Sequence, residues 1–197
     1  MLKDLKNEIR GYKTKYDKQL DEFNKQKQYI DEIYNKGASK WLEEYAKAKQ
    51  LFDYNVKIMR ENKIEIVNGR IDEVINKLKD KITTGITPDI AAELQILKIV
   101  KVNKEELTAY VEKYKYNYLI CKALKEIAEE NKIDIEIESI QDKVEDIEEL
   151  RHMVVEFFNM YDGEPRYKCE LMINGAIIDN VSNRLNSFFE SNNTRVI

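Results

Sequence analysis

A seven-residue repeat of apolar side chains runs along the amino end of this chain. Apolar residues recur at positions 2, 9, 16, 23 and 30, and others lie three or four residues from them. On a helix this spacing draws one apolar seam, which is typical of helices that wind around each other. Gln19 and Gln26 interrupt the seam. We therefore expect a loose bundle or an antiparallel hairpin more than a tight dimeric zipper.

The seam changes register near Ile33 and then continues to Met59, with Gly37 beside the change. A register change of this kind unwinds a supercoil locally without ending the helix, and a glycine permits a bend. We predict one helix over about residues 3–61, roughly 85–90 Å long at about 1.5 Å per residue. Its seam is the predicted interaction surface: Leu2, Leu5, Ile9, Tyr12, Tyr16, Phe23, Ile30, Ile33, Trp41, Tyr45 and Phe52.

Glycine and proline are scarce, with 6 and 2 residues, so little interrupts long helices. The predicted fold class is all-α, with a long N-terminal coiled-coil-like helix and a small C-terminal helical domain. Asn68-Gly69 predicts a turn, followed by a short return helix over about 71–82. The predicted domains are residues 1–83 and residues 84–197.

Start signals predict the helices of the second half. They are a helix over 88–101 after Thr87, a longer helix from Asn103 with Glu106 to Ala128, a helix from Ser139 with Asp142 to Tyr161, and a final helix over 166–190 after a turn at 162–165. Apolar and charged residues alternate in 63–67 and 132–138. These two segments could pair as one minor two-stranded ribbon.

The charge is unevenly distributed. Residues 1–83 hold 19 Lys or Arg against 15 Asp or Glu, while residues 84–197 hold 14 against 22. Opposite signs in the two halves favour antiparallel or head-to-tail contact between copies of the chain. The expected partner is a protein, either a second copy or a foreign one. A nucleic-acid-associated or regulatory role of the basic half is the alternative, although no clustered basic stripe supports it.

No constellation of residues predicts chemistry. His152 is the only histidine, and no motif places a nucleophile near it, so a partly buried structural role is expected. The acidic run 145–149 lies on one helix face and does not converge on a cation. The tyrosines of 110–118 predict core packing. Cys121 and Cys169 lack metal-site spacing and predict small buried hydrophobes. We expect no enzyme, no cofactor, no metal and no small-molecule substrate.

Targeting signals are also missing from the sequence. The amino end is charged throughout, and no run of about 18 apolar residues occurs anywhere. A membrane partner is therefore not expected, and the predicted compartment is the cytoplasm.

The stretch 86–131 carries TPD before an amphipathic segment, then NKEEL and a tyrosine-rich segment that ends in ALKEIAEEN. In these features it resembles uncharacterised helical proteins encoded among the virion head genes of phages and prophages of Gram-positive bacteria. The resemblance implies a structural or scaffold-like role in phage assembly, with a virion-associated location, and it supplies no catalytic residues. Together with the long helix it predicts a non-enzymatic assembly protein.

Overall fold

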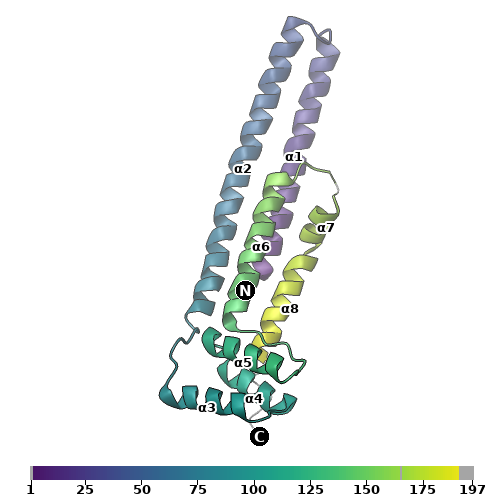
Figure 1. The fold of residues 1–197 in the computed structure, drawn as a ribbon. Coiled ribbons are helices and arrows are strands. Elements are labelled where there is room, and N and C mark those ends of the chain that lie inside the picture. The colour runs from purple at the N-terminus through teal and green to yellow at the C-terminus, as the bar shows by residue number, and fades with distance from the viewer. Residues whose placement is uncertain (1, 165, 191–197) are drawn as a thin grey trace. The chain divides into compact units, whose positions relative to one another are not determined.

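The computed structural model describes residues 2–164 and 166–190, and this part of the chain is all-α without strands. The predicted fold class is confirmed, although several helices begin and end elsewhere. Eight helices follow one another within these residues (Figure 1): α1 Lys3–Ile33, α2 Ser39–Lys79, α3 Pro88–Ile99, α4 Lys104–Tyr114, α5 Tyr118–Glu130, α6 Ile140–Met160, α7 Tyr167–Asn174 and α8 Ala176–Glu190.

The chain divides into two compact units, each assembled from separate stretches of sequence. The first unit holds residues 1–71 and 150–180, and the second holds residues 72–149 and 181–197. Helices α2, α6 and α8 contribute residues to both. The predicted boundary at residue 83 does not separate these units, because residues 150–180 belong with the N-terminal hairpin.

The predicted single helix over residues 3–61 is wrong, because the chain reverses after Ile33. Tyr34 has an extended backbone, and Gly37 has a φ of 86°, in the left-handed region that glycine adopts without strain. Ser39 then begins α2, which returns beside α1 (Figure 1). The register change in the seam therefore marks the turn of a helical hairpin, and the seam residues after it lie on the second arm.

Helix α2 continues through Asn68-Gly69, where a turn was predicted. Val67 and Ile71 are fully buried along this part of the helix. Burial at helical spacing contributes more than a glycine inside a helix costs, which is about 1 kcal/mol. Segment 63–67 is also helical, while residues 133–139 form neither helix nor strand, so the predicted ribbon is absent from the described residues.

Polar side chains hold the two arms of the hairpin in antiparallel register. Three contacts follow one another from the turn toward the amino end: Trp41 Nε1 donates to Asp31 at 2.8 Å, Asn55 Nδ2 donates to Gln19 Oε1 at 2.9 Å, and Lys63 pairs with Glu8. Residue 19 is therefore level with residue 55.

The amino-terminal half of α1 is covered by α6 and α7. The ring of Tyr12 lies 4.9 Å from that of Phe158, and its hydroxyl donates to the Phe158 carbonyl at 3.4 Å. The Arg10 guanidinium donates to the carbonyls of Ile173 and Asn174 at the carboxyl end of α7. Those carbonyls have no partner within their own helix, so Arg10 supplies one from α1.

The predicted start signals of the second half are confirmed. The Thr87 side chain accepts from Ile90 N at α3, and Asn103 forms a capping box at α4. Ser139 likewise donates to the Asp142 carboxylate at the start of α6. The predicted helix from 103 to 128 is wrong, however, because it breaks between α4 and α5, where Asn117 caps α5.

The predicted final helix over 166–190 is also wrong, because it breaks at Gly175. This residue has a φ of 87°, and its N–H bonds the carbonyls of Leu171 and Met172. Beyond the break, Ile178 is buried and Ile177 is partly buried. Pro165, part of the predicted turn at 162–165, lies outside the described residues.

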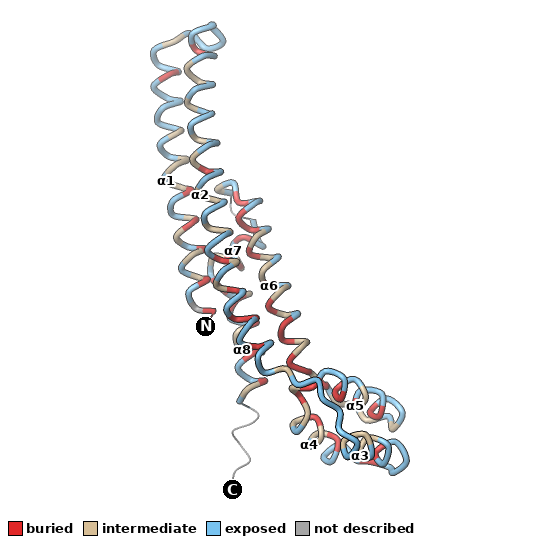
Figure 2. Tube along the Cα trace, turned by 90° about the vertical axis from the view of Figure 1, so that its left-hand side faces the viewer, coloured by how far each residue is buried: buried red, intermediate tan, exposed pale blue. Residues whose placement is uncertain are grey.

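The second unit has its own core, built mainly from α4 and α5. Its fully buried members include Leu107, Leu124 and Ile127. In the segment after α5, Ile133 and Ile135 pack against this core, and Ile137 is buried in it. The alternation that suggested a strand thus reflects a non-helical segment that turns every second side chain inward. Figure 2 shows buried residues among α4 and α5.

Candidate interaction surface

The structure places the predicted seam residues mostly between the chain's own helices. Leu2, Leu5, Ile9, Tyr12, Tyr16, Ile30 and Trp41 are buried, Phe23, Tyr45 and Phe52 are partly buried, and Ile33 is exposed. The seam of α1 therefore packs against α2 and α6 of the same chain. A surface that is open to a partner consists of other residues.

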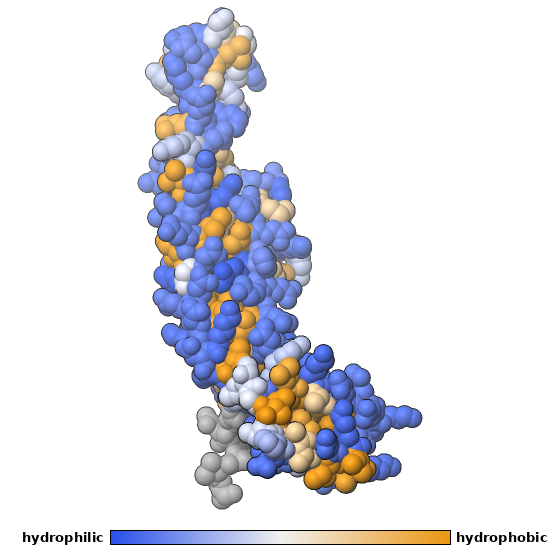
Figure 3. Space-filling view, turned by 60° about the vertical axis from the view of Figure 1, so that its left-hand side comes forward, coloured by the Kyte–Doolittle hydropathy of each residue, from blue (hydrophilic) through white to orange (hydrophobic). Residues whose placement is uncertain are grey.

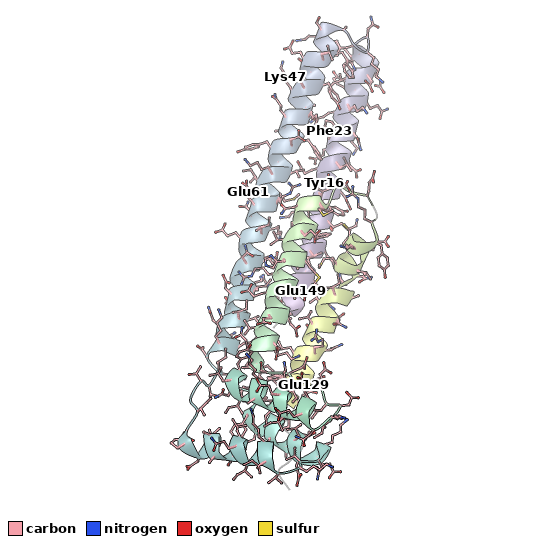
Figure 4. The ribbon with its side chains drawn as sticks, viewed as in Figure 1. Tyr16, Phe23, Lys47, Glu61, Glu129 and Glu149 are labelled. Carbon is pink, nitrogen blue, oxygen red and sulfur yellow. The ribbon has the colours of Figure 1, made fainter. Side chains whose placement is uncertain are left out.

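Aromatic rings fill the space between the arms of the hairpin. Phe23 of α1 stacks on Phe52 of α2 at 5.1 Å, and Tyr16 meets the same Phe52 at 6.0 Å. Toward the turn, Tyr45 contacts both Phe23 and Trp41. Figure 4 labels Tyr16 and Phe23 on α1, whose rings face α2. These contacts hold together the part of the hairpin nearest its turn, which we call the distal part.

This distal part consists of two helices alone. No residue of α1 between Tyr16 and Ile30 is buried, and none of α2 between Trp41 and Val56. Figures 1 and 2 show α6 and α7 alongside only the lower part of the hairpin. A pair of helices leaves the flanks of both arms exposed, so their composition decides what they can bind.

One flank of α2 carries a row of exposed apolar side chains, which we name the flank stripe: Leu51, Tyr54, Ile58 and Ile66. Their exposed fractions are 52%, 62%, 39% and 42%. Spacings of three, four and eight residues place them on one helix face. Space filling shows apolar patches spaced along the hairpin (Figure 3). Isolated exposed apolar residues are ordinary, whereas several on one helix face are typical of an interaction site; here Asn62 lies between the last two.

Two shallow grooves run between the flank stripe and α1. The first has a volume of about 510 Å³, and its lining includes Lys25, Tyr29 and Leu51. The second, of about 920 Å³, is lined in part by Lys15, Lys18, Tyr54, Ile58 and Ile66. Apolar side chains of α2 and lysines of α1 therefore border the same surface. A partner helix with apolar and acidic residues would match this surface.

The charged side chains beside the flank stripe make few and weak ion pairs within the chain. Lys18 lies 3.9 Å from Glu22, and Lys57 lies 3.8 Å from Glu61, both between exposed residues. Such pairs contribute about 0–1 kcal/mol. Lys25 and Glu65 make no ion pair within the described residues. Lys47 and Glu61 project from the outer side of α2 (Figure 4).

The remaining sequence candidates do not form a catalytic or metal site within the described residues. His152 is exposed on α6, so its expected partial burial is wrong. Asp146, from the acidic run, pairs with Lys143 and Arg184. No three Asp, Glu, His or Cys side chains of the described part are grouped to hold a metal ion.

The tyrosine cluster packs only in part as predicted, because Tyr118 is 43% exposed. Tyr110 and Tyr114 stack at 6.5 Å and lie against the second-unit core. The Tyr114 hydroxyl donates to Glu93 at 2.6 Å. Hydrogen bonds from Tyr114 and Lys113 hold the pKa of Glu93 below its usual value. These contacts hold α3 against α4.

Two lysines of the second unit, Lys115 and Lys143, are buried although lysine is usually exposed. Lys115 donates to the Phe188 carbonyl, and Lys143 lies 2.6 Å from Glu138. Both ammonium groups approach the face of the Phe188 ring, at 4.7 and 5.7 Å. The arrangement neutralises the buried charges and fixes the last turn of α8. No local pattern distinguishes these lysines from the exposed ones.

An apolar pocket of about 540 Å³ lies in the first unit, beside α6 and α7. Met153, Phe157, Met160 and Met172 line it, and Cys169 lies at its wall. Methionine side chains adapt to irregular shapes, so the pocket could accept apolar groups of several forms. Lys168 and Arg166 contribute charge at its edge, and Arg166 is paired with Asp162.

Within the described residues, no helix combines the length and the apolar character needed to cross a membrane. Comparison of the chain with protein-family models, with curated proteins and with solved structures finds no match in any of the three.

Proposed function

We propose that this chain is a non-enzymatic assembly or scaffolding protein that acts through helix–helix contacts, and that the flank stripe is its contact surface. The observation that carries this proposal is the row Leu51, Tyr54, Ile58 and Ile66 on one face of α2. All four are exposed, and Leu51 and Tyr54 lie in the section between Trp41 and Val56 that holds no buried residue. Side chains at this spacing form a ridge that fits the groove of another helix.

The energetics favour this role. Fully burying a side chain of this size contributes about 1.5–3 kcal/mol. Association of two proteins costs an estimated 4–15 kcal/mol in lost freedom of motion. The four stripe side chains are 39–62% exposed, so covering each contributes roughly half of the full-burial value. Four covered together offset part of the association cost, while one or two do not. Adjacent charges on α1 and α2 would add specificity to the contact.

The test is light scattering coupled to size exclusion over a wide range of protein concentrations. We expect the mass of the wild-type particle to rise with concentration. Ile58→Lys should abolish the rise because it places a charge in the middle of the flank stripe. Leu42→Lys is the matched control, since Leu42 is also on α2 and 54% exposed but lies outside the stripe. A particle that stays monomeric throughout would contradict the proposal.

The phage resemblance of residues 86–131 supplies a narrower form of this proposal, a scaffold-like role in virion assembly. The long hairpin supports an assembly role in general and does not select a virion. Co-purification of the chain with phage particles or their precursors would test the narrower form.

The alternative, nucleic-acid binding through the basic N-terminal half, has less support. Lys15, Lys18 and Lys25 do share one flank, but Lys47, Lys49 and other lysines of the hairpin pair with carboxylates one turn away. Phosphate-driven binding must weaken steeply as salt rises. A titration with random-sequence DNA and RNA at low salt, repeated at moderate salt, distinguishes this alternative.

A further inference from the structure

We propose that the flank stripe pairs with the flank stripe of a second copy of this chain, antiparallel, with Ile58 at the two-fold axis. This inference rests on the proposed function and specifies its partner. The resulting contact would unite two hairpins in a four-helix arrangement, the usual way in which exposed hairpin flanks are covered.

The spacing of the stripe is nearly symmetric about Ile58. Leu51 lies seven residues before it and Ile66 eight after it, while Tyr54 and Asn62 lie four before and four after. In a two-fold contact between antiparallel helices, a residue before the axis meets the residue equally far after the axis on the other copy. Leu51 of one copy therefore lies within one residue of the level of Ile66 of the other. Tyr54 meets Asn62, an amide that can bond its hydroxyl.

The charges on the two arms fit the same arrangement. Because Gln19 is level with Asn55, Lys18 is level with about residue 56 of its own α2, and Lys25 with about residue 49. A two-fold axis at Ile58 places residue 56 of one copy opposite about residue 60 of the other. It places residue 49 opposite about residue 67. Lys18 then lies within about one residue of the level of Glu61 of the second copy, and Lys25 within about two residues of the level of its Glu65.

These charged groups are available for such pairing. Lys25 and Glu65 make no ion pair within the described residues, and the pairs of Lys18 and Glu61 are exposed and long, at 3.9 and 3.8 Å. In a parallel arrangement the lysines would lie level with lysines, and the carboxylates with carboxylates. Like charges placed opposite each other disfavour a contact by several kcal/mol. The charge pattern therefore selects the antiparallel orientation.

Cysteine cross-linking of the full chain tests the orientation and the register. Ile58→Cys should cross-link to itself with a short bismaleimide. Leu51→Cys and Ile66→Cys should each fail to cross-link alone but should cross-link when mixed. Leu42→Cys, outside the stripe, is the control and should not form a cross-link between copies. The wild-type chain, whose Cys121 and Cys169 are buried, gives the background.

Charge reversal supplies an independent readout. Glu61→Lys with Glu65→Lys should weaken self-association by about ten-fold or more. Mixing this variant with Lys18→Glu plus Lys25→Glu should restore it, because each variant then meets opposite charges on the other. Sedimentation velocity measures both effects.

The outcomes separate this inference from the proposed function. If the particle self-associates but Leu51→Cys cross-links to itself and not to Ile66→Cys, the antiparallel inference is overturned while the assembly role stands. The same holds if Leu42→Cys cross-links as well as Ile58→Cys, because the contact then lies elsewhere. A particle that stays monomeric at every concentration overturns both.

Discussion

At the scale of single residues, the two thiols show how burial sets reactivity. Burial, with a contribution from Asp142, raises the pKa of Cys121 to about 11, and burial also raises the pKa of Cys169. Since the thiolate is the reactive form, both should react slowly with a disulfide reagent near neutral pH and quickly in denaturant. Timed absorbance measurements check this. Rapid labelling of either native thiol would contradict the buried placement.

Helix caps could be predicted from the sequence, whereas the burial of individual polar side chains could not. The caps at Thr87 and Asn103 were predicted correctly because a cap involves residues within one turn. Burial of Lys115 and Lys143 was not predicted, since it depends on Phe188, which is far away in sequence. His152 was placed wrongly for the same reason, because its neighbours on α6 do not determine which face is covered.

At the scale of elements, two glycines provide a paired test of where the hairpin turns. Gly37→Ala should destabilise the protein by about 1–2 kcal/mol, because alanine is strained at a φ of 86°. Gly69→Ala should stabilise it by about 0.5–1 kcal/mol, because Gly69 lies inside α2. A Cβ at either position meets nothing within 4 Å, so the backbone alone decides the sign.

Urea unfolding followed by circular dichroism measures both changes, and Gly11→Ala, inside α1, is the control for a helical glycine. Destabilisation by Gly69→Ala would show that Asn68-Gly69 forms the turn after all. The sequence supported both readings because a left-handed glycine and a helical glycine look alike without their backbone angles. What decides between them is the burial of Val67 and Ile71 on α2.

At the scale of the whole molecule, the sequence indicated that the seam of α1 needs a covering helix but not which one. Phe23 and Tyr16 pack equally well in principle against a second chain or against Phe52 of α2, which the structure shows. The sequence alone does not reveal the flank stripe, because Leu51 directly precedes the seam residue Phe52 and so falls outside the apolar periodicity. The periodicity that places Phe52 inside leaves Leu51 as an isolated exposed residue until the hairpin is known.

The composition of the first unit predicts how the chain behaves when it is cut. A fragment of residues 1–83 retains the hairpin but loses Phe158 and Tyr161, whose rings lie 4.9 and 6.1 Å from Tyr12. Each such aromatic contact contributes about 0.5–1.5 kcal/mol beyond its buried area. The fragment should therefore melt well below the full chain, while residues 1–71 joined to 150–180 by a flexible linker should keep a cooperative transition. Thermal circular dichroism compares them. Equal melting of the 1–83 fragment and the full chain would mean that the hairpin folds independently of residues 150–180.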